Sequence, residues 1–199
     1  MTKRIQSRVL QLATWMMILG MAPPLTAGET KEIYTGTAVS VGGTVSGQLA
    51  STTFNLTLEG YTSDEEAQRY LTTLAEEKQD GLLKAISKQK LGFFSLSGQV
   101  GRTINVVRVH NLDEGKRKVV VVFERWLKMA EVRNGYRSRD YPFGVIEIVM
   151  DPDGKGEGTY IGAAKIRWVT DDKTGKKSVE IENFATYPTR LMGVAKRSK

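Results

Sequence analysis

The side chains best suited to binding a ligand lie in one stretch, residues 126–143, between two strongly predicted strands. The alternation typical of strands is absent from this stretch. This stretch interleaves aromatic rings with cations. Aromatic faces beside guanidinium groups suit an anionic or sugar-like ligand, through stacking and bidentate hydrogen bonds. We therefore predict a ligand-binding site formed by Trp126, Arg133, Tyr136, Arg137, Arg139 and Tyr141. The alternative is structural: the rings close one end of the core, and Arg139 forms an ion pair with Asp140.

The composition excludes several kinds of catalytic and metal site. The chain has no Cys and one His, His110, so a thiol nucleophile, a zinc finger, an iron–sulfur cluster and a multi-histidine metal site are all excluded. No G-x-S-x-G motif accompanies His110, which is predicted to end a strand next to a turn. We predict no catalytic residue, no metal and no cofactor. The enzyme alternative is a hydrolase with two facing carboxylates, for which the candidates are Glu124, Glu131, Asp140 and Glu147.

The glycine-rich stretch 154–158 is not typical of a phosphate-binding loop. No Ser or Thr follows Lys155, and the pattern predicts a strand after it, where a phosphate site needs a helix. Asp151, Asp153 and Glu157 carry oxygens that calcium accepts, but they lack the spacing of an EF-hand loop. Asp-Pro-Asp-Gly at 151–154 predicts a turn.

The first 27 residues are typical of a secretory signal peptide. Lys3, Arg4 and Arg8 precede an uncharged, mostly apolar stretch at residues 9–22, and small residues follow near Ala27. The apolar stretch is shorter than the roughly 20 residues of a permanent membrane span. We expect cleavage after Ala27 or Gly28 and export to the periplasm or the outside, leaving no stable membrane span.

The net charge of +7 depends on the two ends of the chain. The signal region holds three basic residues and a basic tail at 190–199 holds four, whereas residues 28–189 carry 22 basic and 22 acidic side chains. A nucleic-acid-binding protein needs a basic face on the fold itself, so we expect no nucleic-acid partner. Residues 84–139 carry a net charge of +9. They would attract an anionic lipid, polysaccharide or peptide if they shared one face; alternatively, they are solvated strand positions neutralised by acids from elsewhere.

Two short helices are predicted before the main run of strands. Ser63 and Glu66 form a capping box, and an apolar stripe at helical spacing follows from Ala67 to Ala75. A second helix is predicted to begin near Asp80. Residues 28–50 are rich in Gly, Ser and Thr and predict an irregular or edge-strand arm.

After residue 90 the hydrophobic period changes from 3.6 to 2, which indicates strands. Short turns between consecutive strands indicate antiparallel hairpins. The predicted fold class is therefore α+β and β-rich: one domain, residues 28–199, with a curved antiparallel sheet or partly closed barrel. We expect a meander of about seven to nine strands, with the helix pair packed on one face or end. The predicted strands lie near residues 53–58, 94–97, 103–109, 118–123, 145–150, 160–169, 178–184 and 189–194.

Three phrases of the sequence resemble a group of uncharacterised exported bacterial proteins. They are residues 62–68 (TSDEEAQ), 138–147 (SRDYPFGVIE) and 153–159 (DGKGEGT). The resemblance implies export and a single domain, and it implies no activity.

The sequence hypothesis for function is a non-enzymatic, exported binding module of the cell envelope. Its ligand would be a small amphipathic molecule held in the concavity of the sheet, or an anionic surface. The hydrolase described above is one alternative. Another is an envelope structural or interaction protein that uses an exposed edge strand.

Overall fold

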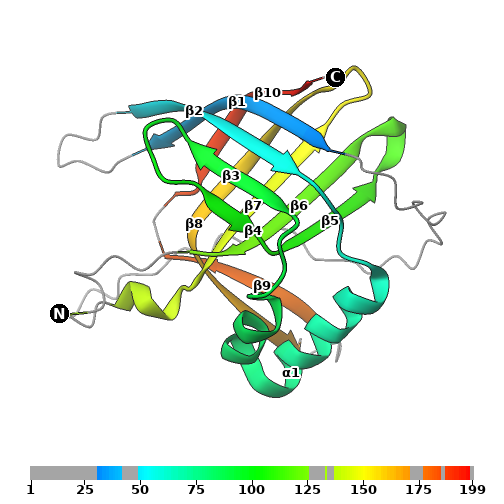
Figure 1. Cartoon of the computed structure of the whole chain (residues 1–199), viewed down its shortest axis with the longest axis vertical. Helices are drawn as coiled ribbons and strands as arrows, with labels where there is room; N and C mark the ends of the chain where they lie inside the picture. Colours follow the sequence, from blue (N-terminus) through cyan, green and yellow to red (C-terminus); the bar gives the residue numbers. More distant parts are fainter. Residues whose placement is uncertain are drawn as a thin grey trace, which may run out of the picture.

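The structure is a computed structural model, and it describes residues 31–41, 49–125, 133, 137–170, 177–184 and 187–197. Within these residues the chain forms one α-helix and ten strands that share one antiparallel sheet (Figure 1). The elements in chain order are β1 (Glu32–Val41), β2 (Leu49–Leu58), α1 (Asp64–Ile86), β3 (Gly92–Leu96), β4 (Arg102–Ile104), β5 (Val106–Asn111), η1 (Asp113–Gly115), β6 (Arg117–Glu124), η2 (Arg137–Asp140), β7 (Phe143–Met150), β8 (Lys155–Thr170), β9 (Lys177–Asn183) and β10 (Thr189–Arg197).

The strand order is β4-β3-β2-β1-β10-β8-β7-β6-β5, and β9 pairs with β8. Two meanders, β1 to β4 and β5 to β9, are joined by β10, which lies between β1 and β8. Ala164 of β8 pairs with both Phe143 of β7 and Asn183 of β9. The end of β8 and β9 therefore form a ribbon that extends beyond the rest of the sheet. The β-rich antiparallel fold is confirmed, although its ten strands do not close into a barrel.

The two edges of the sheet are consecutive segments of the chain, joined at Asn105. This buried residue separates β4 from β5. Its backbone N–H donates to the carbonyl of Val122 at 3.1 Å, and its side-chain amide donates to the carbonyl of Gln89 at 3.0 Å. Its side-chain oxygen accepts from the backbone N–H of Glu124 at 2.9 Å. A strand predicted to run unbroken over residues 103–109 is thus divided by a residue that anchors both edges.

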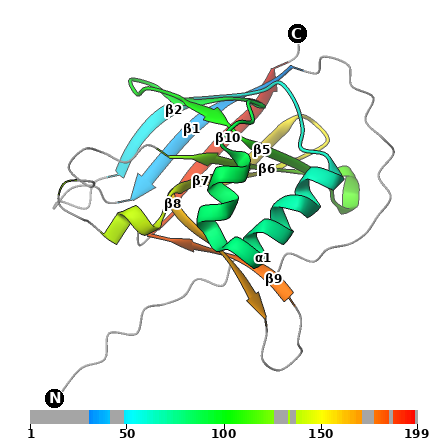
Figure 2. The ribbon, with the colours of Figure 1, turned by 60° about the horizontal axis from the view of Figure 1, so that its bottom comes forward.

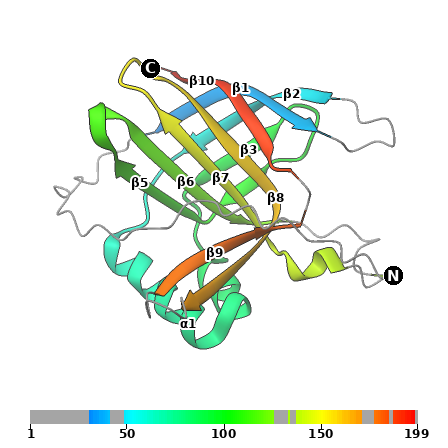
Figure 3. The ribbon, with the colours of Figure 1, turned by 180° about the vertical axis from the view of Figure 1, so that it is seen from behind.

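The main core lies on the concave face of the sheet. Because nine strands of one sheet contribute to this single cluster, the sheet must curve around it, as Figure 3 shows from behind. The ring of Phe123 packs directly over Gly144, where a Cβ atom would lie 2.3 Å from the ring. The largest fully buried core side chains are Tyr34, Phe54, Phe123, Leu56, Leu58, Ile104, Ile146, Ile148 and Leu191.

The prediction of a helix pair is wrong, because the structure holds a single helix in this region, α1. Its capping box is confirmed: Ser63 Oγ accepts from the Glu66 backbone N–H at 3.1 Å, and Glu66 accepts from the Ser63 N–H at 3.0 Å. The helix bends at Lys78, whose φ of 61° is not helical, and Figure 2 shows the bend. The second predicted helix is the continuation of α1 beyond this kink, because a single non-helical residue gives no room for a loop.

Helix α1 covers the convex face of the sheet near the β8–β9 ribbon. Tyr70, Leu74 and Ile86 of α1 pack in a second cluster with side chains of β7 and β8, including Val145 and Ile161. These strands therefore bury residues on both faces. The burial explains why the segments around residues 118–123 and 143–150 are almost continuously apolar.

The prediction of an irregular or edge-strand arm before residue 50 is also wrong. β1 begins at Glu32 and lies between β2 and β10, deep in the strand order. Its Gly, Ser and Thr residues obscured a central strand, because small side chains weaken the apolar alternation on which the prediction depended.

Candidate ligand-binding site

The predicted site residues lie in the connection between β6 and β7, and the structure describes four of the six. Arg133, Arg137 and Arg139 are exposed, whereas Tyr141 is buried. The two others, Trp126 and Tyr136, lie outside the described residues. The structure thus places the arginines in contact with solvent and gives Tyr141 a position within the fold.

Two side chains hold the end of this connection in place. The guanidinium of Arg125 donates to the carbonyls of Ser138 and Tyr141. The side-chain amide of Gln79, on α1, donates to the carbonyl of Asp140 at 3.1 Å. η2 is therefore fixed through its backbone, and its two arginine side chains are exposed.

Tyr141 joins the connection to the β8–β9 ribbon. Its hydroxyl donates to Oε1 of Glu182, and its ring meets Phe184 edge-on with 5.1 Å between the ring centroids. The hydrogen bond to Glu182, followed by burial, raises the pKa of Tyr141. Arg167 forms ion pairs with Glu182 at 3.0 Å and with Glu180 at 3.1 Å. Tyr141 therefore fixes the segment against the ribbon.

The connection from β6 to β7 leaves and re-enters the sheet at one particular end. Antiparallel pairing places the ends of β1, β3 and β6 and the starts of β2, β7 and β10 at this end, which we call the pocket end. The opposite end, where β1 and β6 begin, we call the Glu32 end.

On β1 and β2 the concave face becomes less filled toward the pocket end, because the side chains become smaller. Along β1 the inward positions pass from Tyr34 to Ala38 and Ser40. Along β2 they pass from Phe54 to Thr52. The decrease in size leaves a cavity of about 240 Å³ at the pocket end.

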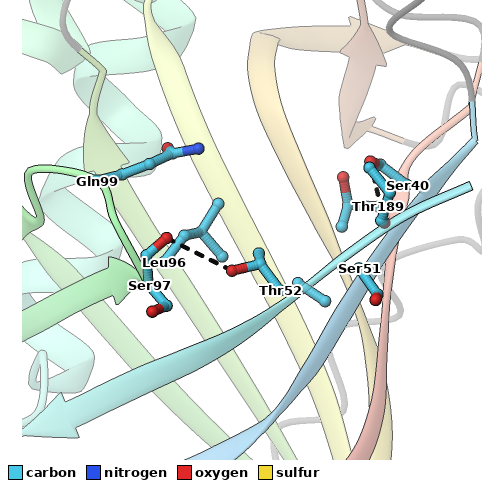
Figure 4. Close-up of a pocket in the computed structure, with 9 residues that line it drawn as sticks. Ser40, Ser51, Thr52, Leu96, Ser97, Gln99 and Thr189 are labelled. Carbon is cyan, nitrogen blue, oxygen red and sulfur yellow. Dashed lines mark hydrogen bonds between the residues drawn. The ribbon is translucent and has the colours of Figure 1, made fainter.

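The cavity is lined by uncharged side chains from three separate parts of the chain (Figure 4). Thr52 Oγ1 donates to the carbonyl of Ser97 at 3.4 Å, and Ser40 Oγ donates to the carbonyl of Ala50 at 3.5 Å. Both hydrogen bonds are long, and therefore weak, so a ligand can compete for these hydroxyls. The lining residues are Ala38, Ser40, Ala50, Ser51, Thr52, Leu96, Ser97, Gln99 and Thr189.

An ionic cluster around the buried Glu32 occupies the Glu32 end. The Glu32 carboxylate accepts hydrogen bonds from Arg117 at 2.9 Å, from Lys196 at 2.6 Å and from the Tyr34 hydroxyl at 2.6 Å. Arg117 also donates to the Tyr61 hydroxyl at 3.2 Å. Burial raises the pKa of Glu32, but the three hydrogen bonds outweigh it and lower this pKa to about 2. The cluster is internally satisfied, which is typical of a structural closure.

The positions of the acidic candidates bear on the hydrolase alternative. Glu124 pairs with Phe143, and Glu147 lies four residues further along β7, so their backbones are about 13 Å apart at 3.3 Å per residue. Paired glycosidase carboxyl groups lie roughly 5–9 Å apart. Glu147 instead forms an ion pair with Lys118 at 2.9 Å, and Glu131 lies outside the described residues.

The other chemical candidates belong to strands and turns. His110 lies on β5 opposite Lys118, where burial, followed by the charges of Arg108 and Lys118, lowers its pKa. Glycine-rich residues 155–158 lie within β8, and no helix follows them directly. Among the described residues, no group of three or more His, Cys, Asp or Glu side chains is placed to hold a metal.

Sequence reasoning missed both the cavity and the Glu32 cluster. Arg117 and Lys196 lie 85 and 164 residues from Glu32 along the chain, and no local pattern connects them. One signal for the cavity was present: inward positions of β1 and β2 change from large apolar to small hydroxyl-bearing residues along each strand. That signal becomes readable only once both segments are known to be strands.

No described helix is long and apolar enough to cross a membrane. Comparison of the chain with protein-family models, with curated proteins and with solved structures finds no match.

Proposed function

We propose that this protein is a non-enzymatic, exported binding module of the cell envelope, and that it takes a small ligand in the cavity at the pocket end. The observation that carries the proposal is the cavity itself. It combines apolar side chains with several convergent polar groups, which is typical of small-molecule sites. Its volume of about 240 Å³ lies below the usual range for drug-sized ligands, so the ligand is small.

The rest of the concave face supports this choice of location. On β1 and β2, the large side chains of Tyr34 and Phe54 fill the interior away from the pocket end. A ligand in the concavity is therefore accommodated where the side chains are small. The exposed Arg137 and Arg139 lie on the connection that returns to this end, and we propose that they contact the outer part of the ligand.

We propose export on the basis of the signal-like sequence of residues 1–27, which lie outside the described residues. The resemblance to exported bacterial proteins supports the same location. The hydrolase alternative is less favoured, because Glu147 already forms an ion pair with Lys118 at 2.9 Å.

Native mass spectrometry of the protein purified from its own host tests the binding function. We expect a retained small molecule with the unaltered protein and its loss from Ala50→Phe, which places a ring in the cavity. Ala195→Phe is the matched control, because Ala195 is an exposed strand residue near the Glu32 end. Retention of the same molecule by Ala50→Phe, or the absence of any bound molecule from the unaltered protein, would contradict the proposal.

A further inference from the structure

The geometry points to an uncharged, hydroxyl-rich ligand the size of a single sugar ring, such as a monosaccharide or a cyclic polyol. This inference rests on the proposed function and specifies the class of ligand. It follows from three properties of the cavity: the absence of charge in its lining, the kind of polar groups, and their arrangement around an apolar patch.

None of the described residues that line the cavity is ionisable. A charged group placed deep in this partly open cavity would lose part of its hydration without gaining an opposite charge, which is unfavourable. Arg137 and Arg139 lie outside the lining and do not supply that charge to the interior. The portion of the ligand that enters the cavity is therefore neutral.

The polar side chains that the lining offers include the hydroxyls of Ser40, Thr52 and Thr189 and the primary amide of Gln99, whereas Ser51 alternates with Thr52 along β2 and is directed to the opposite face. A hydroxyl donates one hydrogen bond and accepts two, and an amide both donates and accepts. Thr52 and Ser40 direct their protons to backbone carbonyls, so their oxygens offer lone pairs to the cavity. Gln99 offers both donors and an acceptor. Such a mixed set matches ligand groups that also donate and accept, and hydroxyl groups are the simplest of these.

An apolar patch completes the match. The cavity lining also includes three apolar residues, Leu96, Ala38 and Ala50. Figure 4 shows Leu96 beside Thr52. A sugar ring carries C–H groups as well as hydroxyls, so it can place apolar atoms against this patch while its hydroxyls reach the polar ones. A fatty chain would leave the primary amide of Gln99 without a ligand partner, and an inorganic anion would leave the apolar patch unused.

Isothermal titration calorimetry with a defined panel tests the inference. The panel contains glucose, galactose, N-acetylglucosamine and inositol, with octanoate and inorganic phosphate as contrasting probes, all at millimolar concentration. We expect at least one neutral probe to bind. Thr52→Val and Gln99→Leu should each weaken that binding about three- to tenfold, because each removes hydrogen-bonding capacity.

Thr57→Val is the matched control, because it makes the same substitution on β2 but at a position directed away from the core. It should leave the affinity unchanged. Binding of octanoate or phosphate that Ala50→Phe abolishes, without binding of any neutral probe, would overturn the ligand class and leave the binding function standing. Failure of the whole panel would also overturn the ligand class, and the mass spectrometry described above then decides the binding function separately.

Discussion

Arg117 of β6 donates a 2.9 Å hydrogen bond to Glu32 of β1, although three strands separate β6 from β1 in the sheet order. The contact therefore crosses the space that the curved sheet encloses. Lys196 of β10 and the Tyr34 hydroxyl bind the same carboxylate. One end of the sheet is thus closed by ionic contacts, whereas the other end retains a cavity.

Glu32→Gln should lower the free energy of unfolding by about 2–4 kcal/mol, because the change leaves Arg117 and Lys196 without their carboxylate. Urea denaturation at pH 7 measures the loss. Glu59→Gln is the control, because Glu59 forms an exposed ion pair with Lys31 at 3.7 Å. Exposed pairs contribute roughly 0–1 kcal/mol. Equal, small effects of the two substitutions would show that the Glu32 cluster contributes little to stability.

The stabilising effect of Glu32 should depend on pH. Its pKa is lowered from 4.5 to about 2 in the folded protein, so the unfolded chain binds the proton more readily than the folded chain. The contribution is therefore complete above about pH 5 and is lost as the pH falls toward 2. The difference in unfolding free energy between the unaltered protein and Glu32→Gln should fall by more than half from pH 7 to pH 3.

His110 does not disturb this comparison, because it titrates in both proteins and its effect cancels in the difference. A difference that stays constant over this pH range would contradict the lowered pKa of Glu32.

Replacing both Arg137 and Arg139 with Ala should weaken ligand binding and leave the melting temperature nearly unchanged. Both side chains are exposed, and surface substitutions usually change stability by less than about 0.5 kcal/mol. Arg125→Ala should behave differently, because Arg125 donates to the carbonyls of Ser138 and Tyr141. It should lower the melting temperature clearly. A large loss of stability in the double variant would instead give the two exposed arginines a structural role.

Gly144→Ala should destabilise the protein by about 1–3 kcal/mol, because the added methyl group overpacks the core. A Cβ atom at this position would lie 2.3 Å from the ring of Phe123. Gly162→Ala is the control, because its Cβ would approach only the end of the Tyr160 side chain, at 3.2 Å. Chemical denaturation compares the two. Similar stabilities would show that the Phe123 ring moves aside without cost.

The sequence predicts the parts of the fold whose signals are local. The Ser63–Glu66 capping box and the apolar runs of β6 and β7 depend on neighbouring residues, and the structure confirms them. β1 escaped recognition because its inward positions are partly small or polar. The pattern separated one bent helix into two, because the polar residues 76–80 around the kink at Lys78 interrupt the apolar stripe of α1.

The candidate site was harder to predict, for a physical reason. The cavity brings Thr52, Gln99 and Thr189 together, and their proximity depends on the position of β10 between β1 and β8. The arginine-rich connection was predicted from its own composition. Its return to the pocket end became apparent only from the strand register.

The most direct test of the account is an NMR titration of the ¹⁵N-labelled protein with the tightest-binding neutral sugar of the panel. The account predicts saturable shifts of the backbone amides of Thr52 and Ser97 and of the side-chain amide of Gln99, with no change at Glu32 or Arg117. Saturable shifts confined to the Glu32 end, or no saturable shift at the pocket end, would contradict it.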